Sequence, residues 1–131
     1  MIRRLGAIFR DRDGVAAVEF ALVVPILIAL IWAIFQLALV FEAQAGMQNA
    51  LGQAARYATV FPTPSDDEIK AKITSARFGG VQGIWGTPTI ATDDAAGTKT
   101  ITVSYSQPMS FLLFNGPSIT LTKTKVVYLS T

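Results

Sequence analysis

Residues 20–41 read FALVVPILIALIWAIFQLALVF, and this stretch decides the fold because none of its 22 residues is charged. Fifteen of the 22 are Val, Ile, Leu or Phe. A helix that crosses a bilayer needs roughly 20 apolar residues. Each of these side chains favours insertion by about 0.3 to 0.6 kcal/mol, so one Pro and one Gln do not reverse the balance. The stretch therefore predicts a single membrane-spanning helix.

Two other interpretations of this stretch are a core helix of a soluble protein and a cleaved secretory signal peptide. The rest of the chain is too small to wrap a core helix of this length. A signal peptide has an apolar region of about 7–15 residues, followed by small residues in an Ala-x-Ala pattern. Ala43-Gln44-Ala45 does follow the stretch, but the stretch is longer and the helical pattern continues past it. These features favour a membrane anchor.

The distribution of charge predicts which side of the membrane each segment occupies. The net charge of +2 comes from residues 1–14, with four arginines and two aspartates, because the other seven basic and seven acidic residues cancel. A basic segment beside an apolar run stays in the cytoplasm. We expect residues 1–14 to be a cytoplasmic basic leader and the chain from Glu42 onward to lie outside. The later basic residues are scattered among acids, so we expect no nucleic-acid surface.

The residue types exclude several kinds of chemistry. The chain has no Cys and no His, so it cannot form a Cys/His zinc site, a Cys nucleophile or a Ser-His-Asp triad. The acidic clusters at 66–68 and 93–94 are better explained as a helix cap and a turn than as metal ligands. We therefore expect no catalytic, cofactor or metal residues and no small-molecule substrate, which means that the protein is not an enzyme.

The helical pattern continues beyond the apolar stretch as far as Phe61, with small residues at every fourth position. This spacing lets two helices pack closely, although Ala is also simply a good helix former. We predict one helix over residues 15–61, about 70 Å long at 1.5 Å per residue, that spans the membrane over about 20–41. The helix-packing candidates are Ala17, Ala21, Ala29, Ala33, Gly46, Ala50, Ala54 and Ala58.

Residues 62–131 are expected to form a small exterior domain. Pro62-Thr63-Pro64 ends the long helix, and Ser65 followed by Glu68 forms a capping box that predicts a short helix at Asp66–Arg77. The apolar pattern then changes to a period of two, which is typical of half-buried strands. Three antiparallel strands are predicted, at Thr89–Thr92, around Ile101–Ser106 and at Ile119–Leu129.

The third predicted strand has an irregular pattern. Lys123 and Lys125 fall in phase with Ile119 and Leu121, which predicts a bulge or twist before Val126. A domain of this size without disulfides has a marginal core, so we expect it to pack against the protruding helix. The predicted fold class is α+β: a long transmembrane and protruding helix, then a small domain with a short helix and about three antiparallel strands.

An apolar loop between Pro108 and Pro117 is unusual for a segment facing solvent. One interpretation is that it contacts a partner protein. The other is that it fills the domain's own core against Leu51 and Tyr57. The candidate partner-contact residues are Met109, Phe111, Leu112, Leu113 and Phe114.

Residues 14–25 read GVAAVEFALVVP, with Glu19 at the entrance to the apolar stretch. On helix chemistry alone, Glu19 is an acid that favours the helix dipole and reaches to the interface. The motif, however, resembles that of class III prepilins, and more closely the TadE-like minor pilins (pseudopilins) of tight-adherence (Flp-type, type IVb) pili. In that family, prepilin peptidase cuts after a Gly and a Glu is fifth in the mature chain.

The resemblance implies a processing site between Gly14 and Val15, and assembly roles for Glu19, Phe20 and Pro25. The resemblance implies that the protein is a structural and assembly component of a tight-adherence pilus. It also implies a single-pass protein of the bacterial inner membrane that can later be incorporated into the pilus or its tip. Expected partners are membrane lipid, prepilin peptidase, other pilins and pilus assembly proteins. One departure is Gln36, where many members carry an acid. The alternative function is a bitopic, membrane-anchored binding module with an exterior ligand- or partner-binding domain.

Overall fold

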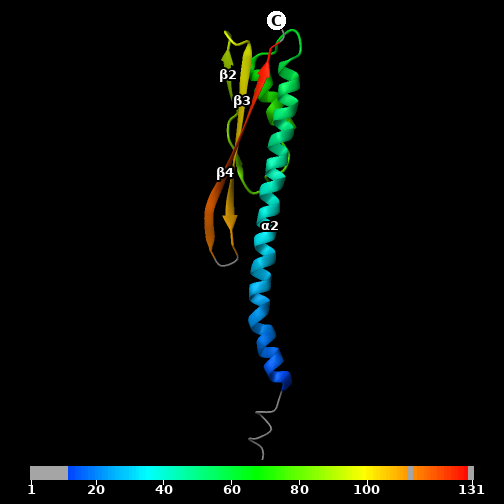
Figure 1. The fold of residues 1–131 in the computed structure, drawn as a ribbon, viewed down its shortest axis with the longest axis vertical. Helices are drawn as coiled ribbons and strands as arrows, with labels where there is room; N and C mark the ends of the chain where they lie inside the picture. Colours follow the sequence, from blue (N-terminus) through cyan, green and yellow to red (C-terminus); the bar gives the residue numbers. More distant parts are fainter. Residues whose placement is uncertain (1–11, 112–113, 130–131) are drawn as a thin grey trace, which may run out of the picture.

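A computed structural model describes residues 12–111 and 114–129 and shows an elongated molecule built along one long helix (Figure 1). Helix α2 (Arg12–Ala58) has 47 residues, continues through Pro25, and is about 70 Å long at 1.5 Å per residue. It ends three residues before the predicted Phe61, in a turn where the N–H of Val60 donates to the carbonyl of Tyr57. The other elements lie along its C-terminal part, and its N-terminal part extends beyond them.

The short helix α3 (Asp66–Ala76) begins at the predicted capping box. The Glu68 carboxylate accepts from the main-chain N–H of Ser65 at 2.8 Å, and the Ser65 hydroxyl accepts from the N–H of Glu68 at 3.3 Å. A hydrogen bond joins the end of α3 to α2: Asn49 Nδ2 donates to the carbonyl of Ala76 at 3.0 Å. The two helices therefore pack together along the upper part of α2.

The sheet has four antiparallel strands, in place of the three or so expected. The long strand β3 (Thr98–Ser110) is central, and β4 (Asn115–Tyr128) pairs with it on one side. On the other side, β2 (Thr89–Asp93) pairs with the first half of β3, and β1 (Ile84–Trp85) pairs with Tyr105 and Ser106. The predicted α+β fold class is confirmed.

The period of two in β3 is the pattern that positions the sheet. Ile101, Val103 and Tyr105 are fully buried, and the same face continues to Lys99 and Gln107, which are also buried. These side chains meet α2 and α3 in one core. The other core residues are Ala43, Met47, Ala50, Leu51, Ala54, Ala55, Ala58, Ile69, Ile73 and Val127.

A bulge or twist was expected before Val126, and the prediction of a bulge there is wrong. The β3–β4 register runs unbroken from Thr98 opposite Tyr128 to Pro108 opposite Ser118, and the one shift in the described ladder lies between Pro108 and Ser110. Lys123 and Lys125 can lie on the same face of β4 as Ile119 and Leu121. A lysine can lay its aliphatic stem along an apolar surface and keep its ammonium group in water.

Candidate functional site

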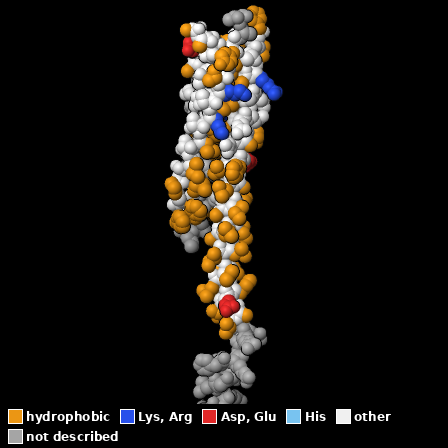
Figure 2. Space-filling model, in the orientation of Figure 1, with side chains coloured by type: hydrophobic (Ala, Val, Ile, Leu, Met, Phe, Trp, Pro, Cys, Tyr) orange, Lys and Arg blue, Asp and Glu red, His pale blue; other side chains and the backbone are white. Residues whose placement is uncertain are grey.

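The N-terminal half of α2 is an apolar surface without a covering layer. Its most apolar window has a mean hydropathy of 2.7, and only 11% of that window is buried. Figure 2 shows hydrophobic side chains covering this lower part, while the Lys and Arg side chains visible on this face gather over the upper part. The helix is long and apolar enough to cross a membrane.

The motif residues 14–25 lie on this exposed N-terminal half of α2. Gly14, Val15 and Glu19 are exposed, and Phe20 is 71% exposed. Residues 1–11 of the predicted leader lie outside the described residues. Pro25 lies within the helix, where its missing N–H leaves the carbonyl of Ala21 without its usual helical donor.

The small-residue positions divide into two groups along α2. Gly46, Ala50, Ala54 and Ala58 are buried within the chain itself. At Gly46 the approach is closest, since an added Cβ would stand 2.0 Å from the carbonyl oxygen of Phe78. In the N-terminal half of α2, by contrast, Ala17, Ala21 and Ala29 are exposed and Ala33 is half-buried.

The apolar loop predicted at residues 109–114 is instead the end of a long β-hairpin. Met109 belongs to β3, and Phe111 and Phe114 exchange two main-chain hydrogen bonds, of 2.9 and 3.3 Å, that close the hairpin. Leu112 and Leu113, which were also predicted to contact a partner, lie outside the described residues. We call Phe111 and Phe114 together the hairpin tip.

The hairpin tip lies beside the uncharged stretch 20–41 of α2 and not beside Leu51 and Tyr57. The prediction that it fills the domain's core is therefore wrong, because β3 and β4 are longer than expected and carry the tip along the helix toward its N-terminus (Figure 1). The rings of Phe111 and Phe114 stack with their centroids 4.9 Å apart. Phe114 stays 64% exposed.

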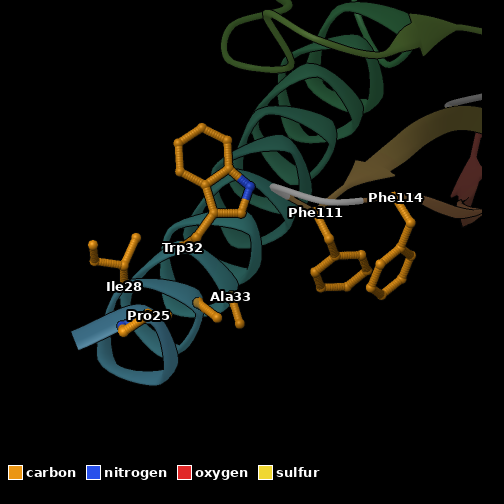
Figure 3. Close-up of a pocket in the computed structure, with 7 residues that line it drawn as sticks. Pro25, Ile28, Trp32, Ala33, Phe111 and Phe114 are labelled. Carbon is orange, nitrogen blue, oxygen red and sulfur yellow. The ribbon is translucent and has the colours of Figure 1, made fainter. Parts of the chain in front are cut away.

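A wholly apolar groove separates the hairpin tip from α2. Its volume is about 480 Å³. Figure 3 shows Phe111 and Phe114 side by side on one wall and Pro25, Ile28, Trp32 and Ala33 on the helix opposite. The seven lining residues are Pro25, Ile28, Ala29, Trp32, Ala33, Phe111 and Phe114.

Two polar side chains of the apolar helix hold the hairpin in place. Trp32 Nε1 and Gln36 Nε2 both donate to the carbonyl oxygen of Ser110, at 2.6 and 2.7 Å. Gln36 is only 1% exposed, and its Oε1 has no hydrogen-bond partner within the part of the chain that the structure describes. The sequence analysis missed this contact. Its one signal is that Gln36 is the only side-chain amide in residues 20–41.

Above the tip, Tyr105 and Gln107 pair their buried polar groups, whereas the buried Nε of Arg77 has no hydrogen-bond partner within the described residues. The hydroxyl of Tyr105 donates to Gln107 Oε1 at 2.6 Å, and burial raises the pKa of that hydroxyl, so it stays a neutral donor. The guanidinium of Arg77 lies 5.1 Å from the ring centroid of Trp85, and burial lowers the pKa of Arg77. Over residues 12–111 and 114–129, no group of acidic side chains is arranged to hold a metal ion.

Comparison with known proteins connects the helix to one family. The family model described as TadE-like protein matches residues 14–56, which include most of α2 and none of the sheet. The resemblance seen in residues 14–25 is thus confirmed and extends along the helix. No curated protein and no solved structure matches the chain.

Proposed function

We propose, from the TadE-like match over residues 14–56, that the chain is a minor pilin or pseudopilin of a tight-adherence (Flp-type) pilus. Its role is structural and concerns assembly, with no catalytic step. In this proposal the leader ends at Gly14 and is removed by prepilin peptidase. Residues 1–14 face the cytoplasm, α2 crosses the bacterial inner membrane, and the sheet domain lies outside.

The observation that carries the proposal is the free N-terminal half of α2. Its large apolar side chains are exposed, including Phe20 at 71%, Ile26 at 71% and Leu22 at 68%. Such a surface needs lipid around it in a membrane or neighbouring helices around it in a fibre. A pilus subunit requires both environments in turn, first as an inserted precursor and then as an assembled protein.

Glu19 is the residue that gives this surface a preferred register. Removal of the leader after Gly14 frees an α-amino group on Val15, one helical turn or about 6 Å from Glu19 along the axis. The carboxylate can pair with that amine or with the amine of a neighbouring subunit. A desolvated pair is favourable only when its geometry is good, so correctly aligned subunits are selected.

Replacing Glu19 separates insertion into the membrane from assembly. Glu19→Ala inserts at wild-type levels, because loss of one carboxylate can only favour the bilayer. The same variant no longer co-purifies with pilus proteins. Glu19→Gln, which keeps the shape and loses the charge, fails equally, and Glu19→Asp is intermediate because its carboxylate is one methylene shorter.

The measurement is co-purification of the tagged protein with its pilus partners, scored beside its abundance in the membrane. Co-purification of Glu19→Ala at wild-type levels would contradict the assembly role. An unprocessed N-terminus together with that result would favour the alternative of a membrane-anchored binding module.

A further inference from the structure

We propose that the hairpin tip enters the outer leaflet of the bilayer beside α2, so that phospholipid acyl chains fill the groove between them. This inference rests on α2 being a membrane span, as proposed above. It adds a second membrane contact, made by the domain that the sequence places wholly outside. The occupant of the groove is lipid, and a second copy of the chain is the outcome that the test must exclude.

The depth of the tip follows from the helix it touches. The uncharged stretch 20–41 is about 33 Å long, close to the roughly 30 Å of a hydrocarbon core. If the core ends at Phe41, Trp32 lies about 14 Å inside it. If the span instead begins at Val15 and includes Glu19, it ends near Ile34 and Trp32 lies about 3 Å inside. Both placements put Trp32, one of the two residues that hold the tip, below the membrane boundary.

The charges of the sheet domain agree with this depth. No charged residue occurs between Lys99 and Lys123, so the entire lower part of the hairpin is uncharged, as is the helix beside it. Above this zone, Lys123 and Lys125 lie near Gln48 and Leu51. At 1.5 Å per residue, Gln48 is about 24 Å beyond Trp32 along α2, so these ammonium groups stay in water.

The described main-chain groups next to the groove have hydrogen-bond partners, as an apolar surrounding requires. A polar backbone group left unpaired in hydrocarbon costs several kcal/mol. Phe111 and Phe114 satisfy each other, and the Ser110 carbonyl accepts from both Trp32 and Gln36. Phe114 itself remains 64% exposed. Trp is also the side chain that commonly marks the interface between hydrocarbon and water.

The lower hairpin has little other support within the domain. Strand β1 pairs only with Tyr105 and Ser106, so beyond Ser106 the sheet narrows to β3 and β4 alone. A two-stranded hairpin is marginally stable in water. Here it stands over an open apolar groove that lipid can fill, which gives this extension of the sheet a stabilising partner.

Because the chain has no Cys, a dye can be attached to a single introduced Cys. Phe114→Cys, labelled with an environment-sensitive nitrobenzoxadiazole dye, is reconstituted as the full chain in phosphatidylethanolamine–phosphatidylglycerol vesicles. The matched control is Val126→Cys, also exposed, at 50%, on the same hairpin. Val126 lies near Ala55, roughly 35 Å further along α2 from Trp32. A cooperative thermal unfolding transition, followed by circular dichroism, reports whether each variant is folded. If Phe114→Cys is not folded, Met109→Cys takes its place.

The expected result is a blue-shifted dye emission at position 114, lost when the lipids carry a quencher on their acyl chains and unaffected by aqueous iodide. The dye at position 126 shows the reverse. Iodide quenching at position 114 would overturn the inference, and so would protection from both quenchers, since that means coverage by a second copy. If the protein is extracted from vesicles by alkaline carbonate, the proposed membrane anchor itself fails; retention with an iodide-quenched tip refutes the inference alone.

Discussion

The side-chain amide of Gln36, in the middle of the apolar helix, donates a hydrogen bond of 2.7 Å to the carbonyl of Ser110, 74 residues later in the chain. This bond connects the uncharged stretch 20–41 with the end of the β3–β4 hairpin. Together with the bond from Trp32 to the same carbonyl, it sets how far the hairpin reaches along α2.

The first prediction concerns these two bonds. Trp32→Phe and Gln36→Leu each remove one donor and leave an apolar side chain in its place. Each bond contributes about 1 kcal/mol, so exchange of the Phe111 and Phe114 amide hydrogens should accelerate roughly fivefold in either variant. Overall unfolding should change less, because the core lies further along α2. Hydrogen exchange followed by NMR in detergent micelles measures both effects.

A control for this prediction is Gln48→Leu, because Gln48 is exposed on the same helix. It should leave exchange at the hairpin tip unchanged. The two donors share one acceptor, so their effects on the exchange rate should not add in the double variant. Equal exchange rates in the wild type and both single variants would show that these bonds do not hold the tip.

The second prediction uses two glycines of α2 that differ only in their surroundings. An added Cβ at Gly46 would stand 2.0 Å from the carbonyl oxygen of Phe78, whereas at Gly52 it would meet nothing within 4 Å. Gly46→Ala should therefore lower the free energy of unfolding by about 1–3 kcal/mol. Gly52→Ala should raise it by up to about 1 kcal/mol, since Ala is the better helix former. Thermal unfolding, followed by circular dichroism, tests whether the two shifts have opposite signs.

The third prediction concerns pH and the cap of α3. Hydrogen bonds from the main-chain N–H and the hydroxyl of Ser65 hold the pKa of Glu68 below its ordinary value of 4.5. The folded state thus favours the charged carboxylate. Its contribution to stability is present above pH 4.5 and is lost as the pH falls through the lowered value. A carbon-13 NMR titration of the Glu68 carboxyl should show this directly.

The matched variant for the cap is Ser65→Ala. It removes the hydroxyl and keeps the main-chain N–H, which is the larger cause of the lowered pKa. The pKa of Glu68 should therefore rise only part of the way toward 4.5. Full recovery of the ordinary value would mean that the hydroxyl, and not the main chain, dominates.

Local signals in the sequence predict much of this fold. The uncharged stretch identifies the helix, the Ser65–Glu68 pair identifies the start of α3, and the alternation from Ile101 to Tyr105 identifies β3. Each signal depends on neighbours within one or two turns or along one strand. For the same reason, the motif at residues 14–25 was sufficient to indicate the family.

The hairpin could not be predicted in this way. Pro108 and Pro117 indicated a loop, because proline removes a main-chain donor from a sheet. In the structure, β1 pairs with β3 only as far as Ser106, so Pro108 lies where one side of β3 is free and the missing donor costs little. The contacts of Ser110 with Trp32 and Gln36 join residues 78 and 74 positions apart, and no local pattern encodes them.

The central claim is that the chain is a processed pilin-like subunit, and the intact mass of the protein extracted from membranes tests it most directly. We predict the mass of a chain that begins at Val15, and the full-length mass for Gly14→Arg, because the proposed cleavage follows the small residue that Arg replaces. A wild-type protein that still begins at Met1 in a host with active prepilin peptidase would contradict the account.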